Sequence, residues 1–179
     1  MIVKTVLQEE DYLTYLLYSA SRSKRSRANR RRSWLVITGA FLVIGYFFYG
    51  KDSFYSYCFF GLAALNLFLY PLYQRYTYKK HYRKFVADNL SHRIGKESTI
   101  DFGSDVIETK DVTGESKFNV SEVTEIIEIN THYFVKLKSD DGLIIPKTAI
   151  DNPDFGEELL AIFDRPEIVL IRELDWKWK

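Results

Sequence analysis

The sequence contains a single cysteine, Cys58, among 179 residues. One thiol cannot build an intramolecular disulfide framework or a multi-cysteine zinc site. The chain also lacks glycine-rich phosphate loops, a nucleophilic serine signature and the histidine spacings of zinc enzymes. We therefore expect no catalytic residues, no metal site and no cofactor, and we predict a protein that is not an enzyme.

The chain has little net charge, +1, but its charges are unevenly distributed. Residues 1–94 carry 15 basic and 5 acidic side chains, a balance of +10. Residues 95–179 carry 10 basic and 19 acidic side chains, a balance of −9. Such an asymmetry between the halves predicts two parts that lie in different environments.

Two long segments lack any charge, and we interpret them as membrane spans. Residues 34–50 and 54–73 are apolar and uncharged, and a bilayer core about 30 Å thick needs roughly 17–25 residues of helix. Only residues 51–53 separate them, so residues 34–73 should form an antiparallel transmembrane hairpin. Two core helices of a soluble protein are the weaker alternative, because burying both would need a larger soluble shell. A cleaved signal peptide is also disfavoured, because a second apolar segment follows closely.

Basic residues flank this predicted hairpin at both outer ends, whereas the connecting turn has one lysine and one aspartate. The positive-inside rule therefore places both termini in the cytoplasm. The basic residues nearest to the spans could also hold anionic lipid head groups, at about 1 kcal/mol for each lysine or arginine. The candidates are Arg30, Arg31, Arg32, Lys79, Lys80, Arg83 and Lys84. A pure topology signal and an acidic protein partner stay open as alternatives, and we expect no nucleic-acid binding.

Within the predicted spans, Asn66 is the one strongly polar side chain. It could contact a partner helix together with the small residues Gly61 and Ala64. The alternative, which we favour, is a hydrogen bond within the hairpin to a backbone carbonyl near Thr38.

Helical spacing continues outside both spans. An acidic turn precedes apolar residues from Tyr12 to Ala20, and a second apolar series runs from Tyr82 to Ile94, before Gly95. The spacing predicts that both membrane helices extend into the cytoplasm. We thus divide this half into residues 1–33, a strand with a basic helix, the hairpin 34–73, and a basic juxtamembrane helix 74–94.

Residues 95–166 change to short β-rich runs separated by turns, including Asp140-Asp141-Gly142. The pattern predicts six antiparallel strands closed by an amphipathic helix, with Asn152 as its N-cap and Pro153 at its first position. Residues 2–7 form a spare β-like run that we expect to add to this sheet. The fold class is therefore an α+β membrane protein.

The tail, residues 167–179, is ambiguous. Val169 and Ile171 alternate as in a strand, and the last residues combine tryptophan with lysine as at a membrane interface. A disordered or sheet-edge terminus is the alternative.

Several segments resemble the YcxB-like family of bacterial membrane proteins. They are EEDYLTYLLY (9–18), SKRSR (23–27), HYRKFVADNLSHRIGKESTIDFGSDVIETKD (81–111) and GESKFNVSEVTEIIEINTHYFVKLKSDDGLIIPKTAI (114–150). This resemblance implies a bacterial inner-membrane location and a cytoplasmic pleckstrin-homology-like (PH-like) domain, and it assigns no catalytic residue. The tail is longer than the usual family end.

The function that this combination favours is an adaptor or sensor. Its PH-like domain would bind a protein, a peptide or an anionic lipid at the inner membrane. An accessory or regulatory subunit of a larger membrane complex, including one that protects against a toxin, is the alternative. An enzyme that acts on lipid is a remote alternative.

Overall fold

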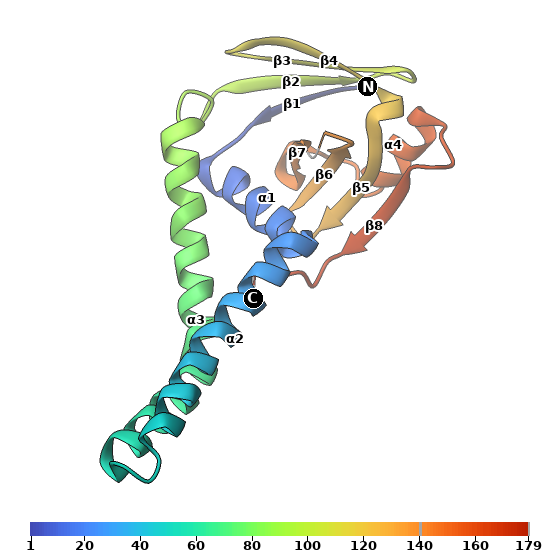
Figure 1. Ribbon diagram of the computed structural model, residues 1–179. Helices are drawn as coiled ribbons and strands as arrows, with labels where there is room; N and C mark the ends of the chain where they lie inside the picture. The colour runs from blue at the N-terminus through green and yellow to red at the C-terminus, as the bar shows by residue number, and fades with distance from the viewer. Residues whose placement is uncertain (140, 179) are drawn as a thin grey trace. The chain divides into compact units, whose positions relative to one another are not determined.

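The computed structural model describes residues 1–139 and 141–178 (Figure 1). Asp140 of the expected hairpin turn and Lys179 of the tail lie outside the described residues. The chain is α+β, as the sequence predicts.

The chain divides into two compact units. The first, which we call the β unit, comprises Met1–Tyr15 and Arg83–Lys177. The second, which we call the hairpin unit, comprises Leu16–Tyr82 and Trp178. Both units are assembled from segments that are distant in the sequence.

Three helices account for the first half of the chain: α1 (Glu9–Arg22), α2 (Lys24–Phe48) and α3 (Ser53–Asn89). Helices α2 and α3 are long and apolar enough to cross a membrane. The expected continuous extension of the first span is wrong, because Ser23 has an extended backbone and starts a new helix. Its hydroxyl accepts a hydrogen bond from the Ser26 amide at 3.3 Å, which is the usual action of an N-cap.

The second extension is continuous, since α3 runs without a break into the β unit. It ends at Asn89, earlier than the expected stop at Gly95. Gly95 instead has a φ of +70° in the turn that follows, a conformation that favours glycine.

Four antiparallel strands form the first sheet of the β unit, which we call sheet A. They are β1 (Ile2–Val6), β2 (Glu97–Phe102), β3 (Val106–Asp111) and β4 (Gly114–Asn119), in that spatial order. Ile2 lies opposite Asp101 and Val6 opposite Glu97. The prediction that residues 2–7 add a strand is thus confirmed, and helices α1 to α3 connect β1 to β2.

Four further strands form sheet B, in the order β7-β6-β5-β8. They are β5 (Val123–Ile129), β6 (His132–Leu137), β7 (Gly142–Pro146) and β8 (Val169–Glu173). Strand β8 comes from the tail and pairs with β5 in parallel. The expectation of a purely antiparallel sheet is therefore wrong at this pair, and the tail contributes a sheet edge.

Two short 3₁₀ helices, η1 (Val120–Glu122) and η2 (Lys147–Ala149), and α4 (Phe155–Phe163) complete the β unit. The predicted cap at Asn152 is wrong, because α4 begins later and Asp154 occupies the N-cap position. Asn152 instead accepts a hydrogen bond from the Asp154 amide at 2.9 Å and donates one to Glu158 at 2.8 Å. It organises the turn before the helix.

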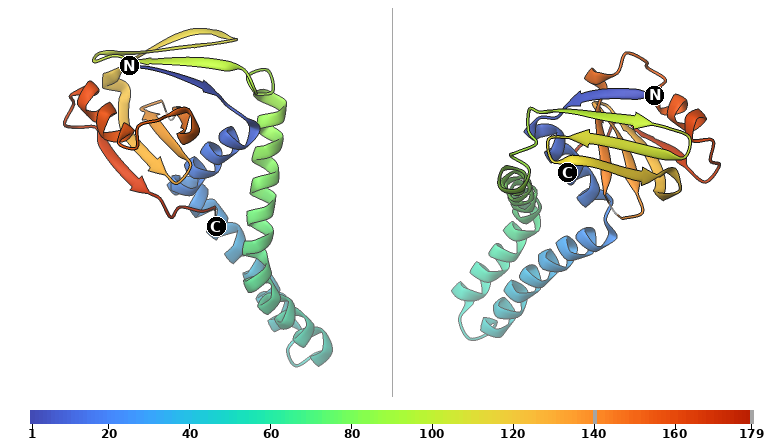
Figure 2. Two further views of the ribbon diagram at one scale, coloured as in Figure 1. Left: turned by 180° about the vertical axis from the view of Figure 1, so that it is seen from behind. Right: turned by 90° about the horizontal axis from the view of Figure 1, so that it is seen from above.

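The core of the β unit lies between the two sheets and α4 (Figure 2). Phe102 of sheet A packs against Phe155 and Phe163 of α4, with ring centroids 6.2 and 6.1 Å apart. Sheet A and sheet B supply most of the other buried side chains, among them Ile100, Ile107, Ile126, Val135 and Ile145.

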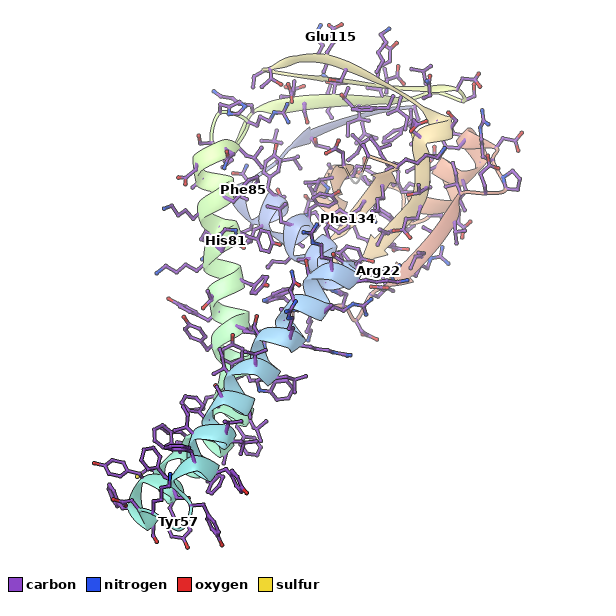
Figure 3. All side chains as sticks on the ribbon, in the orientation of Figure 1. Arg22, Tyr57, His81, Phe85, Glu115 and Phe134 are labelled. Carbon is purple, nitrogen blue, oxygen red and sulfur yellow. The ribbon has the colours of Figure 1, made fainter. Side chains whose placement is uncertain are left out.

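Sheet B is covered on its other face as well. Phe134 is fully buried and its ring lies 5.3 Å from that of Tyr15 on α1 (Figure 3). Gly142 permits this approach, because an added Cβ would lie 2.5 Å from the Tyr15 hydroxyl. The first turns of α1 thus form a third layer on the β unit, which the helical spacing of residues 12–20 did not locate.

Candidate membrane-binding site

The two long helices of the hairpin unit contact each other through small and polar residues. Ser56 is buried and its hydroxyl donates to the Gly45 carbonyl at 3.0 Å. A Cβ at Gly45 would lie 3.1 Å from the Phe60 ring, so glycine allows the close approach here. Beside it, the rings of Phe48 and Phe59 stack with their centroids 6.1 Å apart.

Asn66 forms its hydrogen bond inside the hairpin unit. Its side-chain amide donates to the Thr38 hydroxyl at 2.7 Å, and that hydroxyl donates to the Trp34 carbonyl at 2.9 Å. The acceptor is thus the threonine side chain rather than the backbone carbonyl that we expected. Polar contacts of this kind between membrane helices contribute about 1 kcal/mol.

The other two residues of the predicted partner contact lie on the outer surface of the hairpin. Gly61 and Ala64 are exposed, and a Cβ at Gly61 would meet no atom within 4 Å. Ala63 is the buried small residue of this stretch, at 2% exposure. The structure therefore separates Asn66, which is engaged, from Gly61 and Ala64, which are not.

The seven predicted lipid-binding residues also divide into two groups, and Arg30 is the first that is already engaged. Its guanidinium carbon lies 5.0 Å from the Trp178 ring and 5.8 Å from the Tyr78 ring. Trp178 is buried and donates to the Arg75 carbonyl at 3.3 Å. Because cations stack favourably on aromatic faces, Arg30 is engaged by Tyr78 and Trp178 within the hairpin unit.

Arg83 is the second engaged residue. It forms an ion pair with Glu9 at 3.2 Å and another with Glu10. Both carboxylates lie in the first turn of α1, so the Arg83 charge joins α3 to α1 within the β unit. Its positive charge is compensated by two acidic groups.

The remaining five cations form the second group. Arg31, Arg32, Lys79, Lys80 and Lys84 are all exposed. Within residues 1–139 and 141–178, no ion pair compensates any of the five. They follow or precede the uncharged parts of α2 and α3, where the head groups of a bilayer would lie if these helices span one.

A second polar cluster, in sheet B, escaped the sequence analysis. Glu128 is buried, with its side chain 11% exposed. Its carboxylate accepts hydrogen bonds from Lys147 at 2.7 Å, Arg172 at 3.1 Å and Tyr133 at 3.2 Å. Burial raises the pKa of Glu128, but the Lys147, Arg172 and Tyr133 donors outweigh this effect, so the pKa lies below its ordinary value. The only signal in the sequence was an acidic residue within the apolar run 126–129.

The same cluster changes the phenol of Tyr133. Burial, together with the Glu128 charge, raises the pKa of Tyr133 to about 12. The phenol also contacts the Pro153 carbonyl at 3.1 Å. With its carboxylate fully engaged, the cluster holds sheet B to η2 and offers no free acid or base.

His132 connects α1 to sheet B. Its Nε2 lies 2.9 Å from the Asp11 carboxylate and its Nδ1 lies 2.7 Å from the Thr131 hydroxyl. The ring is buried and stacks on Phe134, with centroids 5.7 Å apart. Over the part of the chain that the structure describes, no group of three or more histidine, cysteine or acidic residues could hold a metal ion.

No protein-family model, curated protein or solved structure matches the chain. The likeness to the YcxB-like family therefore stays a prediction. The function has to be inferred from the chain's own contacts, above all from the division between engaged and unengaged cations.

Proposed function

We propose that the chain is a two-span protein of a bacterial inner membrane that presents a PH-like binding domain to the cytoplasm. In this proposal the β unit is the binding domain and α2 and α3 are the membrane anchor. The five unengaged cations hold anionic lipid head groups at the cytoplasmic surface. The protein acts as a non-enzymatic adaptor or sensor.

The observation that carries the lipid contact is that none of the described residues forms an ion pair with these five cations. Arg83 shows that the chain can compensate a cation with acidic groups, and Arg30 shows that it can engage one on aromatic rings. The five others stay exposed beside uncharged helix. Each contributes about 1 kcal/mol near an anionic surface, so together they favour an anionic over a neutral lipid environment.

The pairing of β1 with β2 supports the proposed topology. These strands are hydrogen-bonded neighbours, yet α2 and α3 lie between them in the sequence. A chain that leaves the β unit after Val6 and returns at Glu97 must cross a membrane an even number of times. Two spans with both termini on one side satisfy this condition, and the basic flanks favour the cytoplasmic side.

The order of the strands supports the PH-like assignment. Strands β1 to β4 form one antiparallel sheet, β5 to β7 form a second, and α4 follows and covers the core between them. The chain differs from the usual PH arrangement in two respects. Three helices are inserted between β1 and β2, and β8 is added after α4. This likeness supports a binding role for the β unit.

The lipid contact is tested with the purified full chain in nanodiscs of phosphatidylcholine and phosphatidylglycerol. Native mass spectrometry should show retained phosphatidylglycerol in excess of its bulk fraction. Changing the five cations to glutamine should abolish the excess, and added salt should reduce it. A matched control changes Lys110 and Lys117, exposed cations that face glutamates on sheet A, and should retain the excess. Equal retention of both lipids by the unaltered chain would refute the contact.

Topology is tested separately in intact cells. Asp52, in the turn between α2 and α3, is changed to cysteine in a Cys58→Ser background. A membrane-impermeant maleimide should label this cysteine from outside. A cysteine in place of Ser104, in the β2–β3 turn, should be labelled only after lysis, and labelling of both without lysis would contradict the topology.

A further inference from the structure

Strand β8 differs from every other strand of the β unit that the structure describes. It forms the only parallel pair, and it lies at the edge of sheet B beside α4 (Figure 2). Without it, the main chain of β5 would present an open edge. Extended peptides bind open edges of this kind by adding a strand, and pockets for alternate side chains give the specificity.

The inward face of this segment carries three alternate side chains, and the first two are apolar. Ile168 is buried in the core at 5% exposure. Leu170 lies against Gly156 of α4, where an added Cβ would be 2.9 Å from a Leu170 methyl group. Glycine inside a helix costs up to about 1 kcal/mol relative to alanine, so the first turn of α4 gives up stability where it leaves room for this leucine.

The third alternate side chain is basic, and an acidic site receives it. Arg172 donates to the buried Glu128 at 3.1 Å and to Glu157 at 2.9 Å. Glu128 is the partner of Arg172 in the parallel ladder, and Glu157 comes from the first turn of α4. The site thus binds an apolar side chain, a leucine side chain and an arginine side chain at positions i, i+2 and i+4 of the added strand.

The side chains of β8 are only partly covered, and none of residues 169–173 is fully buried. Val169 points away and is 55% exposed, and the Arg172 side chain is 51% exposed. Segments with few buried apolar contacts open at a lower free energy than the core. Main-chain hydrogen bonds to β5 and the three inward side chains hold the strand, together with the half-buried Ile171 and Glu173.

From these contacts we infer that the β5 edge beside α4 is a strand-addition site for an extended peptide of a protein partner, occupied in this chain by its own β8. The partner segment carries an apolar residue, a leucine and an arginine at alternate positions, as residues 168–172 do. Binding of the partner displaces β8 from the edge. This site uses none of the five cations, so it does not rest on the proposed lipid contact.

The test uses the full-length chain and a variant that ends at Pro166, both in detergent with the hairpin retained. The probe is a fluorescent peptide with the sequence of residues 167–175. The truncated chain should bind it with a Kd in the micromolar range, about −8 kcal/mol. The full-length chain should bind at least about tenfold more weakly, because β8 competes for the same edge.

Peptide variants test the side-chain specificity. Leu170→Ala and Arg172→Glu in the peptide should each weaken binding by about tenfold or more. Val169→Thr is the matched control, since this side chain points to solvent, and should change Kd by less than about twofold. A folded truncated chain that fails to bind the peptide, or that binds all variants equally, overturns the inference.

If the truncated chain does not fold, hydrogen exchange on the full-length chain tests the inference instead. A displaceable β8 predicts that the amides of residues 169–173 exchange faster than those of β5 and β6, through an opening confined to the edge. Exchange of β8 only together with β5 and β6 would show that it is an inseparable part of the sheet and would overturn the inference.

Discussion

The two sheets of the β unit differ in the number of faces that are covered. Sheet A is covered on one face, and β1 alternates accordingly, with Val3 and Thr5 buried between exposed neighbours. Sheet B is covered on both faces, by the core and by α1, and β6 is buried at every position except Lys136. Period-two alternation therefore describes β1, whereas β6 is buried almost throughout.

The difference also decides what a polar side chain does. On the outer face of sheet A, Lys110 pairs with Glu115, and Lys117 pairs with Glu108 (Glu115 is labelled in Figure 3). These pairs are exposed and contribute little to stability. In sheet B, Glu128 and His132 are buried, and a buried polar group without a partner is costly. Charged and polar side chains thus contribute little to stability on sheet A, whereas on sheet B they stabilise the fold.

The largest expected effect is loss of a side chain beneath α1. Phe134→Ala should destabilise the β unit by about 3–5 kcal/mol, because a fully buried phenylalanine leaves a cavity. Phe118→Ala on sheet A is the matched control and should cost about 1–2 kcal/mol, since Phe118 is only partly buried. Thermal unfolding in detergent, followed by circular dichroism, gives the comparison. Equal losses would mean that α1 does not cover sheet B.

A smaller loss is expected at the acidic cluster. Glu128→Ala should cost about 2–3 kcal/mol, less than for a fully enclosed ion pair, because Lys147 and Arg172 reach solvent. Glu108→Ala on sheet A should leave the unfolding midpoint nearly unchanged. A similar midpoint for both variants would contradict the contrast between the sheets.

The same cluster predicts a pH dependence. The pKa of Glu128 lies below the ordinary glutamate value of 4.5, so the unfolded chain binds this proton more readily than the folded one. The stabilisation is complete above pH 4.5 and is lost as the pH falls through the lower, folded value. The stability difference between the unaltered chain and Glu128→Gln should therefore shrink from pH 6 to pH 3. A difference that stays constant would exclude this linkage.

An intermediate loss is expected at the contact between α1 and His132. Asp11→Ala removes the acceptor for His132 and for the Gln8 amide, whose bond to Asp11 is 2.7 Å long. We expect a cost of about 1–2 kcal/mol and faster hydrogen exchange in β6, with sheet A unchanged. Asp11→Asn keeps an acceptor oxygen and should cost less. Faster exchange in both sheets would show that α1 stabilises the unit as a whole.

The smallest effect belongs to the outer face of sheet A. Lys117→Ala removes a hydrogen-bonded partner of Glu108, and this bond raises the pKa of Lys117 above its ordinary value. The lysine is fully exposed, so we expect no measurable change in the unfolding midpoint at neutral pH. A clear destabilisation would indicate that these ion pairs form a cooperative network.

The elements that a local pattern of residues identifies could be predicted from the sequence. The alternation in residues 2–7 sufficed to expect an added strand, and the uncharged runs sufficed to expect two long helices. The parallel direction of β8 could not be predicted, because strand polarity depends on the connection and not on the residues that alternate. The break at Ser23 was missed because helical spacing continues on both sides of it.

The candidate site was predictable to the extent that charge is visible in a sequence. All seven cations could be named, but their division into engaged and unengaged residues depends on Glu9, Glu10 and Trp178, which are distant in sequence. The helical spacing of α1 indicated a buried face without indicating that Tyr15 meets Phe134. Glu128 was overlooked because its three donors come from three different elements.

The insertion of three helices between β1 and β2 has a consequence for biosynthesis. Thr5 and Ser98 hydrogen-bond across β1 and β2 but are 93 residues apart, so at about 5–20 residues per second the ribosome needs about 5–20 s to supply the second strand after the first. During this interval β1 has no partner. If α2 and α3 cross a bilayer as proposed, a chain with an odd number of crossings could never bring the two strands together. In the proposed topology, completion of sheet A therefore requires correct insertion, and a misinserted chain keeps an unpaired edge on β2.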